Sequence, residues 1–365
     1  MIPASAPGGM KEKRDRLGLD FDSHGIDGFL VTNITNVRYI SGFTGTSGYV
    51  LLAAKDKGFF LTDGRYKLQA RSEVKDLGIK VYRRALDGIA ELVRGFGLKR
   101  LGFEARALDY DAYRRLKKVL PGVMLKPLVN LIEEKRAVKS PSELKGIRKA
   151  IEVAEKGFRR VERGRLSGRA EGEIAWLMEA SCRKAGAQDM AFATIVASGK
   201  RSALPHGVAS AKKIKKGEFV IVDMGVSVDG YKSDKTRTYV IGRAGAMQRK
   251  IYNIVKDAND MAIESIRDGL EARDIDAVAR AFIRKAGYGR CFTHGLGHGV
   301  GLDVHESPSL NPKSTDVLKE GMVVTIEPGI YVPDFGGVRI EDMVLVKKGG
   351  CEILTGGSKE LRILE

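Results

Sequence analysis

Cysteine is scarce in this sequence of 365 residues, and long apolar runs are missing. The three cysteines, Cys182, Cys291 and Cys351, are widely spaced and odd in number. They exclude a disulfide framework and a zinc site built from cysteines, so we expect a reducing compartment. No stretch approaches the roughly 18 consecutive apolar residues of a membrane span, and the N-terminus has no signal-peptide core. We therefore predict a cytoplasmic protein with no membrane segment.

A concentrated charge of either sign is also absent. Lys and Arg exceed Asp and Glu by a formal +17, but this surplus is shared almost evenly between residues 1–130 and the rest. No basic arm carries it, which favours a solvated surface over a nucleic-acid-binding face. With 43% apolar and 30% charged residues the composition is that of a globular protein, and the length suits two domains or one large one.

The first part of the chain has the pattern of an α/β layer. Short β-rich runs such as GFLVTN and YVLLAA alternate with helix-like runs such as DGIAELVRGFG. A boundary follows where Ser140 as N-cap, Pro141 and Glu143 form a capping-box signal for a new helix. We predict an α/β domain over residues 1–134, whose first dozen or so residues are a loose extension.

Residues 135–365 have the pattern of an α+β domain. Helix-like runs extend from Leu144 to Val161, from Met247 to Gly269 and from Asp274 to Ala286. Strand-like runs such as FVIVDMGV, TRTYVIG and VRIEDMVLV lie between and after them. The pattern predicts helices packed on an antiparallel-rich sheet.

The glycine-rich turns do not carry a nucleotide signal. GFTGTSG, over residues 42–48, fits neither the dinucleotide-binding nor the P-loop pattern. Residues 199–202 lack the upstream glycine that a P-loop needs, because Thr194 stands there. We therefore predict plain turns and no nucleotide site.

Histidine is the first sign of chemistry. Of the five histidines, four lie in glycine-rich or turn-like surroundings in the second part of the chain: His206, His294, His298 and His305. The segment THGLGHGVGLDVHE holds more than one of them, and its glycines let the backbone fold tightly around a site. This clustering favours a functional role over a structural one.

Carboxylates within apolar, strand-like runs are the second sign. The four that stand out are Asp223, Asp234, Glu327 and Glu341. A buried charge costs several kcal/mol unless it is paired or bound to a metal. Any one of these acids could pair with Arg237 or Arg339, but four of them together with a histidine are better explained by hard cations.

A turn signal relates two of these acids. Asp229-Gly230 predicts a hairpin that places Asp223 and Asp234 on facing strands. Four acids and one histidine supply more ligands than one ion uses, which indicates two metal ions with bridging carboxylates. Such a pair lowers the pKa of a bridging water to near neutrality. We therefore predict a two-metal hydrolase whose nucleophile is a metal-bridging hydroxide.

At these residues the sequence resembles the pita-bread metallopeptidases, family M24, which include methionine aminopeptidase, prolidase and aminopeptidase P. The resemblance rests on VDMG, SDKTRT, GHGVG, TIEP and RIED. It implies five metal ligands: Asp223, Asp234, His298, Glu327 and Glu341. It also implies that Asp234 and Glu341 bridge two divalent ions, with family habit favouring Mn²⁺ or Co²⁺ over Zn²⁺ or Fe²⁺.

The resemblance implies further roles around the ligands. His206 corresponds to a substrate-binding histidine near the scissile nitrogen, and His305 to one that binds the substrate carbonyl and stabilises the developing oxyanion. Glu327 corresponds to the proton shuttle, so His206, His305 and Glu327 are the catalytic candidates. His294 matches a histidine that lines the proline pocket, and Arg339 an arginine that braces the site carboxylates. A structural role stays open for both.

The N-terminal part extends the resemblance. TNVRYISGFTGTSG and FFLTDGRYKLQA are similar to the creatinase-type N-terminal domain of aminopeptidase P and prolidase-like enzymes, which methionine aminopeptidase lacks. This implies a pita-bread catalytic domain over residues 135–365 behind a creatinase-type domain over residues 1–134. It also implies peptide substrates with proline at the second position, and a homodimer.

Three functions follow, in order of preference. The first is an Xaa-Pro aminopeptidase, which releases the residue before proline. The nearest alternative is an Xaa-Pro dipeptidase (prolidase), because both enzymes use the same five ligands. A non-catalytic binding protein that uses the +17 charge on nucleic acid is more remote, since the ligand set is complete and the charge is spread evenly.

Overall fold

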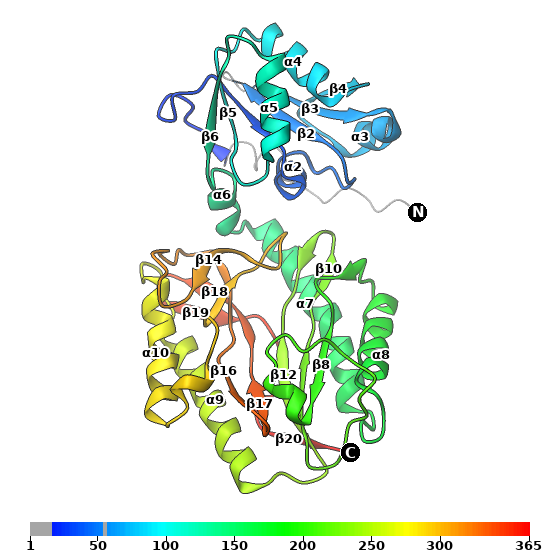
Figure 1. Ribbon diagram of the computed structural model, residues 1–365, viewed down its shortest axis with the longest axis vertical. Helices are drawn as coiled ribbons and strands as arrows, with labels where there is room; N and C mark the ends of the chain where they lie inside the picture. The colour runs from blue at the N-terminus through cyan, green and yellow to red at the C-terminus, as the bar shows by residue number, and fades with distance from the viewer. Residues whose placement is uncertain (1–16, 54–56) are drawn as a thin grey trace. The chain divides into compact units, whose positions relative to one another are not determined.

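The computed structural model describes residues 17–53 and 57–365. The chain forms two compact units, which divide between Arg136 and Ala137 (Figure 1). The extension predicted for the first dozen or so residues lies outside the described residues. Among the described helices, none is both long and apolar enough to cross a membrane.

The N-terminal unit is a mixed sheet with helices, as the alternating pattern predicted. Its six strands run in the order β4-β3-β2-β1-β5-β6. They are β1 Gly28–Val31, β2 Tyr49–Ala53, β3 Lys57–Asp63, β4 Gly78–Tyr82, β5 Arg100–Glu104 and β6 Met124–Leu128. The α-helices are α2 Ile34–Ser41, α3 Lys67–Glu73, α4 Ala85–Gly95, α5 Tyr110–Val119 and α6 Glu133–Ala137, and a 3-10 helix covers Gly64–Tyr66. Leu30, Leu51 and Leu61 of the strands share a core with Ile89 and Val93 of α4.

The C-terminal unit packs helices on antiparallel-rich sheets, which confirms the α+β prediction. Its helices are α7 Pro141–Glu162, α8 Glu171–Lys184, α9 Ala246–Ser265 and α10 Ala272–Lys285, with 3-10 helices at Gly199–Ala203 and Gly289–Cys291. Figure 1 shows α7 and α8 on one flank of the strands and α9 and α10 on the other. Among the described strands of this unit, all pairs are antiparallel except β12 with β20.

Four small sheets make up the layer between these helices. One contains β20 Arg362–Leu364, β12 Thr236–Ile241, β9 Phe219–Asp223 and β8 Ile195–Ser198. The second contains β14 Glu306–Leu310, β13 Gly297–Gly299, β15 Val323–Ile326, β18 Asp342–Lys347 and β19 Gly350–Ile353. The others pair β16 Gly329–Val332 with β17 Gly336–Arg339, and join β11 Tyr231–Lys232, β10 Val226–Val228 and β7 Asp189–Met190.

Helix α7 begins where the sequence predicted. The Ser140 side chain accepts a hydrogen bond from Glu143 N, and the Glu143 carboxylate accepts one of 2.9 Å from Ser140 N. This reciprocal pair satisfies two N–H groups that the helix itself leaves unbonded. The buried face of α7, which includes Ala154 and Phe158, then packs against Met178 of α8.

The predicted turn at Asp229-Gly230 is present, but the prediction that Asp223 and Asp234 lie on facing strands was wrong. Both turn residues have positive φ, 51° and 87°, and join β10 to β11. In the register of β9 and β12, Asp223 lies opposite Thr236, while Asp234 precedes β12. The difference arises because the chain leaves the β9–β12 ladder to form the extra β10–β11 hairpin.

Candidate metal centre

The five predicted ligands lie on strands or strand ends of the C-terminal unit. Asp223 ends β9, Asp234 precedes β12 and Glu341 separates β17 from β18. His298 lies in β13, and Glu327 follows β15. Asp223, Asp234 and Glu341 are only 8%, 4% and 2% exposed. The fold therefore collects acids from different sheets in one water-poor region.

The ligand atoms of these residues are close neighbours. One ligand atom each from Asp234, His298 and Glu341 lie within 4.8 Å of one another. His298 Nε2 is 3.7 Å from Asp234 Oδ2 and 3.3 Å from Glu327 Oε1. The predicted ligands from distant parts of the sequence therefore converge.

Close strand packing fixes His298 beside Glu327. A Cβ on Gly297 would overlap the carbonyl oxygen of Thr325, so only glycine lets β13 approach β15 this closely. Thr325 Oγ1 accepts a hydrogen bond of 3.1 Å from His298 N and donates one of 3.3 Å to Glu327 Oε1. A single hydroxyl thus links the backbone of one candidate ligand to the carboxylate of another.

Burial and mutual repulsion disfavour the ionised form of three of these acids. Burial raises the pKa of Asp234 and of Glu341 well above the usual range, and the neighbouring carboxylates raise both further. Burial also raises the pKa of Asp223, although the charge of Arg339 opposes it. Without cations the cluster therefore resists full ionisation.

Glu327 and His298 form an ion pair within the cluster. Burial alone would raise the pKa of Glu327, but the hydrogen bond and charge of His298 outweigh it and lower that pKa to about 2. Burial would lower the pKa of His298, but Glu327 and Asp234 raise it to about 9. Glu327 and Asp234 thus favour a proton on His298 in the metal-free protein.

In the part of the chain that the structure describes, few cations face the carboxylates of this cluster. Arg339 lies 2.6 Å from Asp223 Oδ2, but Arg237 pairs at 2.7 Å with Asp342 and donates to the carbonyl oxygen of Glu341. One arginine and one histidine therefore serve four carboxylates. Among the described residues, Asp223 Oδ1 is buried without a hydrogen-bond partner. Carboxylate oxygens with one imidazole are a donor set that fits divalent ions.

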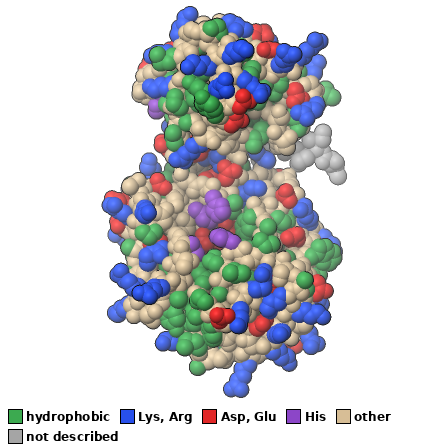
Figure 2. Space-filling view, in the orientation of Figure 1, with side chains coloured by type: hydrophobic (Ala, Val, Ile, Leu, Met, Phe, Trp, Pro, Cys, Tyr) green, Lys and Arg blue, Asp and Glu red, His purple; other side chains and the backbone are tan. Residues whose placement is uncertain are grey.

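Three further candidate histidines lie beside the cluster, and Figure 2 shows histidine side chains gathered next to acidic ones on one face of this unit. The rings of His305 and His298 have centroids 4.2 Å apart. His294 Nε2 is 2.9 Å from Tyr331 Oη, and its Nδ1 is 2.7 Å from a backbone carbonyl. Burial lowers the pKa of His294 and His305, and the charge of His206 adds to both effects, so His206 lies near both.

Two residues of the site were missed from the sequence. Arg339 donates 2.9 Å hydrogen bonds to Tyr331 Oη and to the carbonyl of Pro205 in the His206 loop, and burial raises the pKa of Tyr331 to about 12. Thr236 Oγ1 donates to Glu341 Oε2 at 2.7 Å. The spacing of Thr236 from Asp234 was a usable signal, because residues two apart along an extended chain share a face. The sequence around Tyr331 gave no comparable signal.

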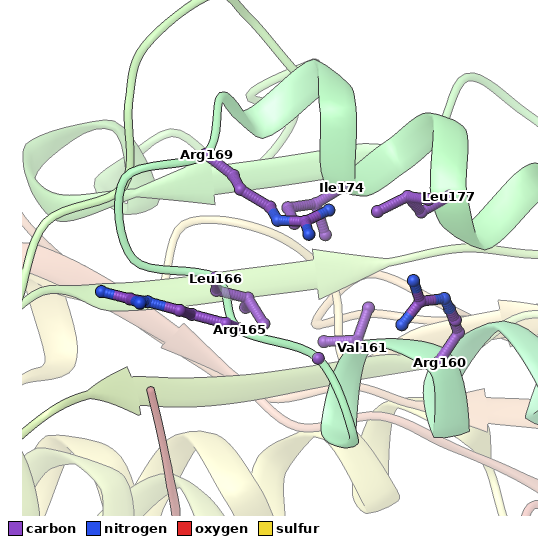
Figure 3. A pocket seen from close by; sticks show the side chains of 8 residues that line it. Arg160, Val161, Arg165, Leu166, Arg169, Ile174 and Leu177 are labelled. Atoms are coloured by element: carbon purple, nitrogen blue, oxygen red, sulfur yellow. The ribbon is translucent and has the colours of Figure 1, made fainter.

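A separate small hollow lies between the end of α7 and the beginning of α8 (Figure 3). It is lined by Arg160, Val161, Gly164, Arg165, Leu166, Arg169, Ile174 and Leu177. These residues offer neither a carboxylate nor an imidazole, and no candidate site residue is among them. The hollow therefore plays no part in the metal site.

Known peptidases resemble this chain over nearly its whole length. The model of Metallopeptidase family M24 matches residues 145–348, and that of the Creatinase/Prolidase N-terminal domain matches residues 13–138. An Xaa-Pro dipeptidase of Pyrococcus horikoshii is 39% identical over 353 residues, which are 96% of this chain and 99% of that protein. The structure of an Xaa-Pro dipeptidase from Bacillus anthracis has a TM-score of 0.94 and 42% identity, covering 98% of this chain and 100% of that one. An X-Pro aminopeptidase from Thermotoga maritima MSB8 has a TM-score of 0.86 and 36% identity, covering 93% and 98%.

Proposed function

The chain belongs to metallopeptidase family M24 and is a hydrolase, and from this premise we propose that it is an Xaa-Pro dipeptidase. The observation that carries the proposal is its full-length likeness to the dipeptidases of P. horikoshii and B. anthracis. The sequence alone favoured the aminopeptidase on its N-terminal motifs. The similarity to the two dipeptidases favours the alternative instead.

The fold is a creatinase-type N-terminal domain followed by a pita-bread domain. We assign these domains to residues 1–134 and 135–365, and catalysis to the second, because all candidate site residues lie there. We also propose a homodimer, as the family resemblance implies.

Five residues are proposed to hold two divalent ions, with Mn²⁺ or Co²⁺ as the preferred ions and Zn²⁺ or Fe²⁺ as alternatives. They are Asp223, Asp234, His298, Glu327 and Glu341. The buried, repelling carboxylates and the unpartnered Asp223 Oδ1 support this assignment. Bound ions would polarise the scissile carbonyl and acidify the attacking water.

The chain's own groups are proposed to bind and orient the substrate and move its proton. His305 donates a hydrogen bond to the substrate carbonyl oxygen and stabilises the charge that develops there, while His206 holds the peptide near the scissile nitrogen. Glu327 accepts the proton of the attacking water and passes it to the departing proline nitrogen. Arg339 holds Asp223 in place through its 2.6 Å contact.

Aromatic rings beside the cluster suit a proline side chain. The ring of His294 lies 5.2 Å from that of Phe292 and 5.5 Å from that of Tyr331, measured between centroids. Both ring nitrogens of His294 face groups of the chain itself, so the ring contributes its apolar surface. The peptide nitrogen of an Xaa-Pro bond carries no hydrogen. A peptidase that cleaves this bond therefore has to bind the substrate through other groups.

The aminopeptidase is the second candidate. The T. maritima structure, which is described as an X-Pro aminopeptidase and is 36% identical to this chain, supports it.

Hydrolysis of paired substrates separates the two candidates. The purified protein is stripped with a chelator, reloaded with Mn²⁺ or Co²⁺, and offered Ala-Pro and Ala-Pro-Ala, with Ala-Ala-Ala and Met-Ala-Ala as controls. We expect metal-dependent cleavage of Ala-Pro alone. Release of Ala from Ala-Pro-Ala at a comparable rate would establish the aminopeptidase, and cleavage of neither proline substrate would overturn both.

A further inference from the structure

A buried ion pair involves Glu306, the residue directly after His305, and the proposed chemistry does not use this pair. Lys139 Nζ lies 2.7 Å from Glu306 Oε1, and the two side chains are only 1% and 5% exposed. The pair joins the residue before the α7 N-cap to the residue after His305. It therefore connects a rigid helix start to the segment that carries a proposed catalytic group.

The lysine end of this pair is firmly anchored. Lys139 N donates a 2.9 Å hydrogen bond to the carbonyl of Gly321, and Lys139 Nζ donates another of 2.9 Å to the carbonyl of Ala137. The next residue, Ser140, forms the capping box of α7. The position of the ammonium group is thus set by backbone on both sides.

The glutamate end anchors the residue next to His305 in the sequence. Glu306 begins β14 and lies opposite Gly299 of β13, next to a bulge in that ladder. Its carboxylate rests against Gly301, where a Cβ would overlap Glu306 Oε1. His305 lies in the bend that directly precedes β14, and its ring centroid is 4.2 Å from that of His298. Anchoring the Glu306 side chain therefore fixes the backbone directly after His305.

A buried pair of this kind is poorly explained by stability alone. Apolar residues of similar volume often replace such pairs without loss of stability, whereas a fixed pair specifies one geometry. We propose that Lys139 and Glu306 are positioning residues that hold the His305 imidazole at the substrate carbonyl. This inference rests on the proposed role of His305.

The first test observes His305 directly in the metal-free protein, without any turnover. Only five histidines occur, so their imidazole NMR signals can be assigned by substitution. In Lys139→Met and Glu306→Gln we expect the His305 signal to shift or split, while the His24 signal stays unchanged. The control is Lys212→Met, which breaks an ion pair of the same 2.7 Å length with Glu218. An unchanged His305 signal in both variants would overturn the proposal.

The second test is a double-mutant cycle with the reloaded enzyme and Ala-Pro. Lys139→Met and Glu306→Gln should each lower kcat by about 10- to 100-fold, with little change in KM or metal content. In a His305→Ala background they should lower kcat hardly further, because the positioned group is gone. An equal loss in both backgrounds would make the pair merely structural.

Conservative variants keep the proposal testable if these proteins do not fold. Lys139→Arg and Glu306→Asp retain both charges, and each should keep a single His305 signal and more activity than its neutral counterpart. A loss as large as that of the neutral variants would contradict a role for the charge pair. If no Xaa-Pro substrate is cleaved, the proposed function fails, while the NMR test still decides the positioning claim.

Discussion

At the scale of single residues, the carboxylate cluster shapes the energetics of the C-terminal unit. Asp234 and Glu341 are buried beside other acids, so their ionised forms are unfavourable in the folded protein. Their raised pKa values reflect this free-energy cost. A cation relieves this cost, and so does removal of one acid. The site is therefore expected to weaken the metal-free fold and to strengthen the metal-bound one.

Asp234→Asn should separate these two effects. An amide needs no proton to be neutral, so the variant should stabilise the metal-free protein at neutral pH by about 1–3 kcal/mol, and loss of a proposed ligand should abolish the stabilisation by Mn²⁺. Thermal unfolding with chelator and with Mn²⁺ measures both. Asp229→Asn, at an exposed turn, is the matched control and should behave as wild type. A metal-free Asp234→Asn protein that is less stable than wild type would contradict the electrostatic account.

The same groups predict how the metal-free protein responds to pH. Because the folded-state pKa of His298 is raised to about 9, its stabilising effect is complete below about pH 6.5 and is lost as the pH rises through 9. The raised pKa values of Asp234 and Glu341 act in the same direction, since the folded state holds their protons where the unfolded state has released them.

We therefore expect the Tm of the metal-free protein to fall between about pH 6 and pH 9 relative to the metal-loaded protein. Comparison with Glu341→Gln at each pH removes the contribution of the general surface charge, and this variant should show a smaller decline. A decline as steep as that of wild type would exclude this carboxylate as its source.

At the scale of secondary structure, local signals predicted elements, and long-range pairing decided the rest. The capping box at Ser140 and Glu143 was readable because its partners are three residues apart. Helix α2 was not, because ITNVRYIS is rich in β-branched and aromatic residues. Its Asn33 N-cap and its C-cap Gly42, with φ of 76°, outweigh that propensity.

The candidate ligands were predictable from the sequence because buried acids in apolar strands are chemically unusual. The contacts that support these ligands could not be predicted from the sequence. Tyr331 meets Arg339 only because β16 pairs with β17, and Lys139 meets Glu306 across 167 positions of sequence. Such contacts depend on the assembled sheets, which no local pattern specifies.

The segment after β19, which includes Thr355, forms hydrogen bonds with β18, the strand that follows Glu341. Thr355 Oγ1 donates a 2.8 Å hydrogen bond to Asp342 Oδ1, the carboxylate paired with Arg237, and accepts one from Met343 N. Thr355→Val should destabilise the protein by about 1–3 kcal/mol, because it leaves buried polar groups unsatisfied. Urea unfolding measures this, with the exposed Ser358→Ala as control. Equal midpoints for the two variants would mean that the segment does not support the strands.

At the scale of the whole molecule, each unit has its own apolar core. All of the candidate ligands lie in the C-terminal unit. The surplus positive charge belongs to neither alone. Lys and Arg side chains are scattered over the visible face of both units, without a continuous stripe (Figure 2). This distribution gives no support to a nucleic-acid-binding function.

Calorimetry should reveal the separate units. We expect two unfolding transitions, of which only that of the C-terminal unit moves when metal is removed. Saturating metal at about 1,000 times its dissociation constant stabilises the binding unit by about 4 kcal/mol. Unfolding of the isolated N-terminal unit, residues 1–136, identifies its transition. Equal movement of both transitions would contradict the assignment of the metal to one unit.

The measurement that tests the central claim most directly is a titration of the metal-free protein with Mn²⁺, following Ala-Pro hydrolysis and bound metal together. The account predicts that activity rises until two ions are bound per chain, and that Glu341→Ala stays inactive throughout. Full activity in the chelator-stripped protein, or wild-type activity in Glu341→Ala, would contradict it.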